Sequence, residues 1–253
     1  MCLIAVAWRQ HPDYPLIVIA NRDEFFERPT APADWWHERP DFLAGRDLRG
    51  GGTWLGVGRD GRFAALTNFR DPARLRDDAR SRGDLVVRAV TDTRPASMSG
   101  QQIAAERDHY NPFNLLVCDG QALVVVESMT GRCSALEPGI HTLSNHLLDT
   151  PWPKARRARR GLEAAVAATP DVEALIDLMH DDRPAPDAAL PATGIPLAWE
   201  RMLSSCFIRA PGYGTRCTTV VLRSADGRVR FVEARWNDTG RPDGRTEATF
   251  TIR

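Results

Sequence analysis

Residues 2–24 read CLIAVAWRQHPDYPLIVIANRDE, and the fold can be predicted by working outward from them. Two apolar runs, Cys2 to Trp8 and Leu16 to Ala20, flank a polar turn, a pattern that predicts two strands joined in a hairpin. The second run is followed by four polar residues, Asn21 to Glu24. Because a hairpin sets the end of its second strand beside the start of its first, we expect these four residues to lie close to Cys2.

This end of the hairpin is a candidate nucleophile site. A thiol attacks only as the thiolate, and an α-amine, with a pKa of about 8, can accept its proton. Removal of Met1, which a small second residue permits, would give Cys2 that amine, so no histidine is needed. Asp23 could then orient the thiol and Arg22 could stabilise the thiolate. Alternatively, Cys2 is a small buried residue that opens a core strand, and the polar residues turn into solvent.

Two asparagines follow expected strands elsewhere in the chain. Asn68 comes after the run Phe63 to Thr67, and Asn145 comes after Ile140 to Ser144. A neutral side-chain amide is a suitable donor to an oxyanion. Asparagine is equally favoured as a turn residue after any strand, so both interpretations remain open.

Composition excludes several classes of protein. The chain has 253 residues, 33 Lys plus Arg and 33 Asp plus Glu, and this balance argues against a nucleic-acid or anionic-membrane binder. We expect no integral membrane segment, because no run approaches the ~18 apolar residues that a spanning helix needs. The five cysteines are widely spaced and lack zinc-site spacing, so neither a metal nor a cofactor is predicted. Without a convincing signal peptide, the expected location is cytoplasmic.

The remaining pattern predicts a single domain over residues 1–253. Asp-Gly pairs at residues 60–61, 119–120 and 226–227 predict further hairpins. Residues 25–49, rich in proline and tryptophan, are expected to be an ordered loop, and residues 181–197 a second loop. Helices are predicted for residues 84–93, 99–110 with Ser99 as N-cap, 153–168 and 171–180, and a short strand for residues 205–209. Several apolar strands show little alternation, which indicates burial on both faces. An α+β fold, a four-layer αββα sandwich, satisfies this pattern.

Motifs along the whole chain resemble those of one family, the Asn-Arg-Asp-Glu (NRDE) family, also called the transport and Golgi organization protein 2 family. The motifs that carry the resemblance are Met1-Cys2-Leu3-Ile4, Ala20-Asn21-Arg22-Asp23-Glu24-Phe25, Gly52-Thr53-Trp54-Leu55-Gly56, Leu66-Thr67-Asn68-Phe69-Arg70, Tyr110-Asn111-Pro112-Phe113-Asn114-Leu115-Leu116, Leu143-Ser144-Asn145, Thr150-Pro151-Trp152-Pro153-Lys154 and Tyr213-Gly214-Thr215-Arg216.

That family is more distantly similar to N-terminal-nucleophile hydrolases of the choloylglycine hydrolase and penicillin V acylase type. The resemblance implies an αββα fold and amide-bond chemistry. It matches Cys2 to the nucleophile, Asn21 and Asp23 to an Asn-x-Asp element, Asn68 to an oxyanion-hole residue and Asn145 to a second active-site asparagine. The hydrolases carry an arginine just before Asn-x-Asp, where this chain has Ala20.

The same hydrolases carry another arginine shortly before a late phenylalanine, where this chain has Cys206 before Phe207. Arg22 is a candidate replacement for the first arginine, and Arg209 and Arg216 are candidates for the second.

Two functions are compatible with these residues. One is a hydrolase or acyl transferase that acts on an amide or a thioester, such as an acyl-CoA, through Cys2. The other, implied by the resemblance, is non-enzymatic handling or trafficking of haem, acyl-CoA or lipid. In either case the partner is a small acyl, lipid or haem-like molecule. A third alternative is a hydrolase fold that has lost its chemistry and serves as an interaction module. The residues predicted to bind it are Trp35, Trp36, Trp54 and Arg216.

Overall fold

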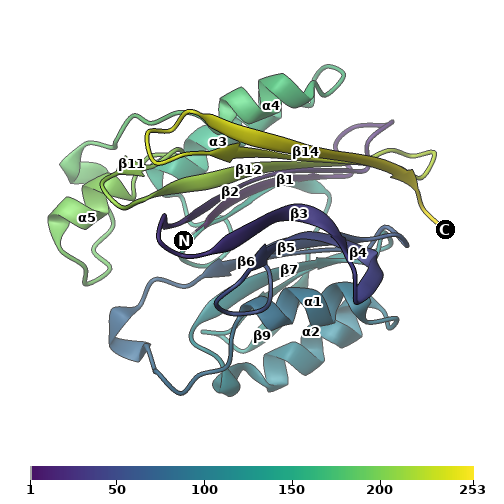
Figure 1. Cartoon of the computed structure of the whole chain (residues 1–253), viewed down its shortest axis with the longest axis horizontal. Coiled ribbons are helices and arrows are strands. Elements are labelled where there is room, and N and C mark those ends of the chain that lie inside the picture. Colours follow the sequence, from purple (N-terminus) through teal and green to yellow (C-terminus); the bar gives the residue numbers. More distant parts are fainter. Residues whose placement is uncertain (1) are drawn as a thin grey trace. The chain divides into compact units, whose positions relative to one another are not determined.

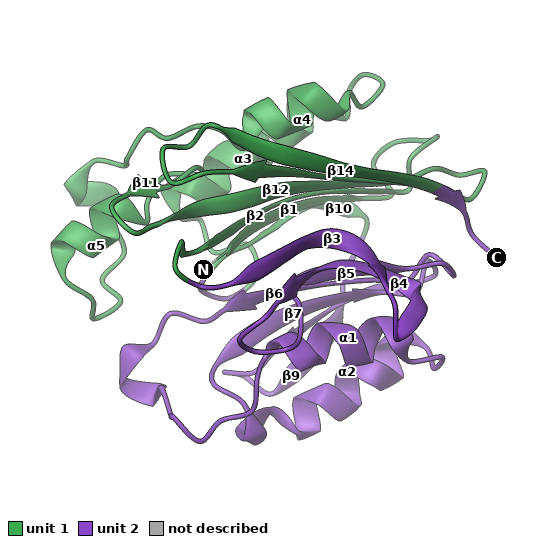
Figure 2. Ribbon diagram, in the orientation of Figure 1, with its two compact units in different colours: residues 1–27, 138–144, 148–249 green, residues 28–137, 145–147, 250–253 purple. Residues whose placement is uncertain are grey.

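The computed structural model describes residues 2–253, so the prediction that Met1 is removed falls outside the described residues. The chain forms two compact units that alternate along the sequence. Unit 1 takes the chain up to residue 27, residues 138–144 and residues 148–249, and unit 2 takes residues 28–137, 145–147 and 250–253. Each unit contains a seven-stranded sheet with helices packed on it (Figures 1 and 2).

The sheet of unit 1 has the order β10-β1-β2-β12-β13-β14, and β11 pairs with β12. Its strands are β1 (Cys2–Trp8), β2 (Leu16–Phe25), β10 (Gly139–Leu143), β11 (Arg209–Ala210), β12 (Tyr213–Arg223), β13 (Arg228–Trp236) and β14 (Pro242–Thr251). Its helices are α3 (Pro153–Ala165), α4 (Val172–Leu178) and α5 (Leu197–Met202), with a 3-10 turn at Asp187–Ala189. The hairpin expected at the start of the chain is confirmed, because β1 and β2 pair antiparallel from Cys2↔Arg22 to Trp8↔Leu16.

Strand alternation divides the side chains of this hairpin between two faces. Leu3, Ala5, Ile17 and Ile19 join one apolar core with residues of α3 and α4, so this is the helix-covered face of the sheet. Cys2 and the residue opposite it belong to the alternate set. The polar side chains at this end of the hairpin therefore lie on both faces of the sheet.

The sheet of unit 2 runs in sequence order, β3-β4-β5-β6-β7-β8-β9. Its strands are β3 (Thr30–Trp36), β4 (Arg39–Asp47), β5 (Leu55–Gly58), β6 (Phe63–Asn68), β7 (Phe113–Cys118), β8 (Leu123–Glu127) and β9 (Arg132–Ala135). Its helices are α1 (Gly83–Thr91) and α2 (Ala96–Ala105), with 3-10 turns at Pro72–Arg74 and Arg107–His109. Both helices contribute to one apolar core against the sheet.

The expectation of a loop over residues 25–49 was wrong, because this segment forms the hairpin of β3 and β4. Pro32 is tolerated because β3 is an edge strand, and the pairing register shifts between Ala31 and Asp34 around it. Pro40 lies in β4 before the first residue that pairs with β5, Phe42. The prolines therefore lie at positions where strand pairing is interrupted, and they do not prevent the hairpin from forming.

Two further local predictions were wrong. Helix α2 begins at Ala96, not after Ser99, because the Ala96 N–H donates to the Asp119 carboxylate at 2.7 Å. This cap comes from the β7–β8 turn and cannot be inferred from the local sequence. The strand expected at residues 205–209 is reduced to Arg209–Ala210, and α5 begins at Leu197, the last residue of the loop expected over residues 181–197.

The α+β class is confirmed. Two antiparallel sheets, each with its own helices, are the layers that an αββα sandwich requires. The prediction of one domain stays a prediction. The hairpins at residues 60–61, 119–120 and 226–227 are confirmed as the β5–β6, β7–β8 and β12–β13 connections.

Candidate functional site

Cys2 opens β1, where it lies directly opposite Arg22 of β2. Its side chain is half-buried, and its main-chain carbonyl accepts a hydrogen bond of 3.1 Å from the Ser144 hydroxyl, just after β10. The main chain of Cys2 is therefore fixed from both neighbouring strands. The expected proximity of the polar residues to Cys2 is confirmed, but they lie inside β2, which continues to Phe25.

The surroundings of Cys2 favour the neutral thiol. Burial raises the pKa of Cys2, and the nearby charge of Asp23 raises it further. The positive charge of Arg22 and a hydrogen bond from the main-chain N–H of Asp23 act in the opposite direction, but the net shift of the pKa is upward. Attack by Cys2 at neutral pH therefore requires a base that takes the thiol proton.

A pair of guanidinium groups lies at the same end of the sheet. Arg22 is buried and is opposite both Cys2 on β1 and Cys217 on β12. Arg216 is the extra residue of a bulge in β12, and it donates to the Phe25 carbonyl at 2.9 Å. Burial lowers the pKa of Arg216, and the charge of Arg22 lowers it further, which places the two cations near each other. Such a pair of cations can stabilise a nearby thiolate or anionic oxygen.

Asp23 occupies the helix-covered face of β2. Its carboxylate is buried and accepts a hydrogen bond of 2.7 Å from the Thr215 hydroxyl, while its main-chain carbonyl accepts one of 3.2 Å from Tyr213. Burial raises the pKa of Asp23, and the positive charge of Lys154 on α3 opposes that rise. The charge of a lysine therefore acts against burial on the pKa of the carboxyl group beside the candidate nucleophile.

Both polar atoms of the Asn21 side-chain amide make hydrogen bonds within the core of unit 1. Its Nδ2 donates to the carbonyls of Met179 and Cys206, both at 2.9 Å, and its Oδ1 accepts from the Thr218 hydroxyl at 2.7 Å. The Thr218 hydroxyl in turn accepts from the Trp236 indole at 3.0 Å. This network ties β2 to the end of α4 and to the segment before β11, so Asn21 fixes the position of the strand that carries Asp23.

The two asparagines proposed for the oxyanion site lie in unit 2. Asn145 Nδ2 donates to the main-chain carbonyl of Asn68 at 2.9 Å, and the Arg70 N–H donates to the Asn145 carbonyl at 2.8 Å. Asn68 ends β6 with a half-buried side chain. Asn145 therefore supports the main chain at Asn68, and the catalytic roles of both residues stay predictions.

The three tryptophans predicted to bind a ligand differ in their surroundings. The indole of Trp35 packs edge-on against Phe250, with ring centroids 5.2 Å apart, and carries the Arg59 guanidinium at 3.8 Å from its centroid. Trp36 belongs to the apolar core beneath α1 and α2, and Trp54 is buried. Of the three, Trp35 is the most accessible.

Sequence reasoning missed Lys154 and Thr215 as functional candidates. Lys154 has 1% of its surface exposed, and it shares the buried face of α3 with Ala158 and Leu162. A lysine at i, followed by apolar residues at i+4 and i+8, was the available signal. Lys154 and Thr215 each stood inside a motif, but nothing in the sequence indicated the hydrogen bond from Thr215 to Asp23.

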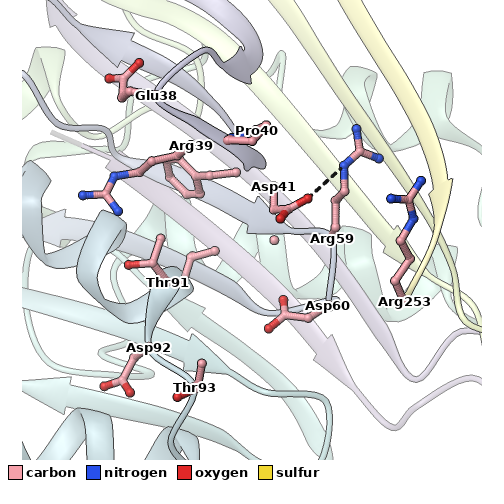
Figure 3. A pocket seen from close by; sticks show the side chains of 13 residues that line it. Glu38, Arg39, Pro40, Asp41, Arg59, Asp60, Thr91, Asp92, Thr93 and Arg253 are labelled. Carbon is pink, nitrogen blue, oxygen red and sulfur yellow. Dashed lines mark ion pairs between the residues drawn. The ribbon is translucent and has the colours of Figure 1, made fainter.

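A charged cavity of about 550 Å³ in unit 2 contains none of the predicted site residues (Figure 3). Its carboxylates are already paired, for example Asp41 with Arg59 at 3.4 Å and Asp60 with Arg62 at 3.5 Å. Over residues 2–253, no three His, Cys, Asp or Glu side chains are grouped as metal ligands. Within the same range, no helix is both long and apolar enough to cross a membrane.

These observations define an α+β protein with a thiol at the start of an inner strand, beside two arginines and a buried aspartate. The chain belongs to the Transport and Golgi organisation 2 family, whose sequence model matches residues 1–238. It is 36% identical over 256 residues to the Transport and Golgi organization protein 2 homolog of Bos taurus, and 35% identical to that of Homo sapiens. Each alignment covers 92% of both chains. The Drosophila melanogaster Transport and Golgi organization protein 2 is 29% identical, with 92% of this chain and 91% of the relative covered.

Two solved structures have a similar path of the backbone. The Caenorhabditis elegans N-acylethanolamine-hydrolyzing acid amidase ortholog has a TM-score of 0.41 and 9% identity, covering 87% of this chain and 92% of that one. A mutant of the conjugated bile acid hydrolase from Clostridium perfringens has a TM-score of 0.45 and 10% identity, covering 100% of this chain and 92% of that one.

Proposed function

We propose that the protein is a cysteine hydrolase or acyl transferase in which Cys2, freed of Met1, attacks the acyl carbon of an amide or a thioester. The observation that carries the proposal is the placement of the thiol. It opens β1 directly opposite Arg22 and receives a hydrogen bond from the main-chain N–H of Asp23. Both groups stabilise a thiolate, which is the attacking species.

The reaction divides into two acyl transfers. Cys2 sulfur bonds to the acyl carbon as its proton passes to the α-amine, and the departing amine or thiol takes up that proton. Water or an acceptor amine then attacks the resulting thioester and releases the acyl group, which restores the thiol. The raised pKa of Cys2 makes this proton acceptor necessary, since little thiolate exists beforehand.

Two groups of residues would assist the attack. Arg22, directly opposite Cys2, supplies positive charge near the thiol, and Arg216 precedes Cys217, the residue of β12 that is opposite Arg22. Asn68 is assigned the oxyanion donor, as the family resemblance implies, and Asn145, whose Nδ2 donates to the main-chain carbonyl of Asn68, is assigned its support. Asn21 holds β2 against α4 through its bonds to main-chain carbonyls, so we assign it positioning and not contact with substrate.

A second candidate, handling of a lipid-like ligand without chemistry, is favoured by one surface feature of unit 1. Phe25, Leu197 and Trp199 are 45%, 50% and 39% exposed. The Phe25 ring lies 6.5 Å from Trp199 and 5.0 Å from Tyr213. Exposed apolar groups gathered in this way are typical of a binding surface. Saturable binding of a fatty acyl-CoA that Trp199→Ala abolishes, without any acylation of the protein, would support this candidate.

Intact-mass spectrometry tests the enzymatic proposal. The purified protein is incubated with an acyl-CoA thioester or an N-acyl amide and then quenched in acid. We expect loss of Met1 and one acyl adduct, assigned to Cys2 by peptide mapping. Cys133→Ala is the matched control, because Cys133 is also half-buried but lies in unit 2, and it should keep the adduct. An adduct that persists in Cys2→Ala would overturn the proposal.

A further inference from the structure

His180 lies in a group of aromatic rings just after α4. Its imidazole stacks on the Phe207 ring, with ring centroids 4.0 Å apart and an interplanar angle of 23°, and meets the Trp236 indole edge-on at 4.7 Å. Phe207 is fully buried and also packs edge-on against Trp236, with ring centroids 5.5 Å apart. Three parts of unit 1 therefore meet at this imidazole, namely the end of α4, the segment before β11 and the end of β13.

The protonation state of His180 follows from its hydrogen bond. Its Nε2 lies 2.9 Å from Nη2 of Arg209 on β11. A guanidinium group has N–H donors but no acceptor, and it keeps its charge in proteins. His180 Nε2 therefore accepts this hydrogen bond, and the imidazole is neutral with its proton on Nδ1.

Arg209 makes two further contacts at the same place. Its guanidinium group pairs with the Asp182 carboxylate at 3.4 Å and lies 5.3 Å from the centre of the Phe207 ring. Burial lowers the pKa of His180, and the positive charge of Arg209 lowers it further. The charged groups that act on His180 are Arg209 on β11, Asp177 on α4 and Asp182 in the segment after α4, while β13 contributes the uncharged indole of Trp236.

The same two chain segments are also tied to β2. Asn21 Nδ2 donates to the main-chain carbonyls of Met179 and Cys206, both at 2.9 Å. These two residues immediately precede His180 and Phe207, whose rings are stacked on each other. The stacked rings and the Asn21 amide therefore hold the same two segments together.

We propose that the hydrogen bond between His180 and Arg209 is a pH-sensitive latch that holds the end of α4 on β11, and that protonation of His180 opens it. A proton taken from water at Nε2 removes the acceptor and leaves two cations at hydrogen-bond distance, where they repel each other. The guanidinium group then leaves the imidazole and keeps Asp182 as its partner. Acid therefore loosens the contact between these two segments, whatever chemistry takes place at Cys2.

The direction of the pH dependence follows from the lowered pKa. The pKa of His180 in the folded protein lies below its ordinary value of 6.5, so the unfolded chain takes up this proton first as pH falls. The stability that the latch provides is therefore complete above pH 6.5 and is lost as pH falls from there through the lowered pKa. His180→Phe keeps an aromatic ring for the stack but has no acceptor, so it should lack this part of the pH dependence.

NMR of the histidine rings measures the ionisation of His180 directly. Its signals are identified among those of the six histidines by their loss in His180→Phe. We expect a midpoint below 6.5 in the wild type and a higher midpoint in Arg209→Met, because the guanidinium charge and its hydrogen bond are gone. Arg230→Met, which removes a similarly exposed arginine that pairs with Glu247, is the matched control and should leave the midpoint in place. A midpoint that does not rise in Arg209→Met would overturn the proposal.

A double-mutant cycle separates the latch from simple packing. His180→Phe, Arg209→Met and the double variant are unfolded by urea at pH values above and below the midpoint that NMR gives. We expect a favourable coupling between the two side chains above the midpoint, and its loss or reversal below, because a protonated imidazole no longer accepts the hydrogen bond. Packing of the rings alone would give a coupling that is independent of pH. The proposal is wrong if the coupling is the same at both pH values, or if His180→Phe keeps the full pH dependence of the wild type.

Discussion

Unit 1 and unit 2 are built alike, since each has seven strands and helices packed on its sheet, but they bury different side chains. The carboxylates that are buried within residues 2–253, Asp23, Glu200 and Glu233, all belong to unit 1, and so does Lys154. Unit 2 buries Arg62 and Arg70 but no carboxylate in that range. Buried charges are costly unless they are compensated. Within the described residues the two units therefore differ in the sign of the charges that they bury: unit 1 buries both carboxylates and cations, and unit 2 buries cations alone.

The largest expected change in the free energy of unfolding comes from a substitution in the apolar core of unit 2. Leu115 on β7 is fully buried among residues of the unit 2 core. Leu115→Ala should lower the free energy of unfolding by roughly 2–5 kcal/mol, because it removes buried methyl groups and leaves a cavity. Leu75→Ala, at a leucine that is 57% exposed in the same unit, is the matched control and should change little. Denaturant unfolding measures both, and equal costs would contradict the assignment of this core.

A smaller change in the free energy of unfolding is expected when the hydrogen-bond network around Asn21 in unit 1 is disrupted. Asn21→Ala leaves the buried carbonyls of Met179 and Cys206 without their donor. We expect a loss of about 1–3 kcal/mol in the free energy of unfolding. Gln101→Ala removes an exposed amide from α2 and should have almost no effect. If both variants unfold at the same denaturant concentration as the wild type, the tie between β2 and α4 contributes nothing to stability.

Two aspartates should give opposite pH dependences. Burial raises the pKa of Asp23 above its unfolded value, so the folded state holds this proton more tightly. Its contribution to stability therefore falls as pH rises from the unfolded pKa, near 3.8, to the raised one. Asp23→Asn should remove this slope of stability against pH.

Asp119 in unit 2 is the counterpart. Burial alone would raise its pKa, but the N–H groups of Ala96, Ala122 and Gln121 lower it below 3.8. The stability it provides is complete above the unfolded pKa and is lost as pH falls through the folded one. Asp119→Asn should cost roughly 1–3 kcal/mol at neutral pH, because it weakens hydrogen bonds to a charged group. Urea unfolding at acid and neutral pH measures both variants, and slopes of the same sign would contradict the comparison.

The sequence predicted those features that local pattern determines. The β1–β2 hairpin follows from two apolar runs around a polar turn, and its register follows from chain reversal, so the meeting of Cys2 with Arg22 was predictable. The Asp-Gly hairpins follow from the left-handed glycine that their turns require, as at Gly61 and Gly120. These are short-range effects that few residues decide.

Features that depend on distant residues could not be predicted in this way. The start of α2 depends on the Asp119 carboxylate, 23 residues further along. The β3–β4 hairpin contains Pro32, which is accepted because β3 is an edge strand, and edge position is a property of the whole sheet. Of the candidate site, Cys2 and Asp23 could be named from motif and position, whereas the partners of Asp23, Thr215 and Lys154, come from segments far apart in the sequence.

The smallest effects should lie at the surface, where the two units are expected to behave alike. Arg230 and Glu247 of unit 1 pair at 2.7 Å, with side chains 42% and 40% exposed. Arg59 and Asp41 of unit 2 pair at 3.4 Å, with side chains 27% and 80% exposed. Because water and salt screen such pairs, a double-mutant cycle on each should give a coupling of roughly 0.2–1 kcal/mol that weakens as salt is added. A strong, salt-independent coupling in unit 1 alone would place the electrostatic difference between the units at their surfaces. Weak coupling in both confines that difference to the buried residues around Asp23, where the solvent cannot screen it.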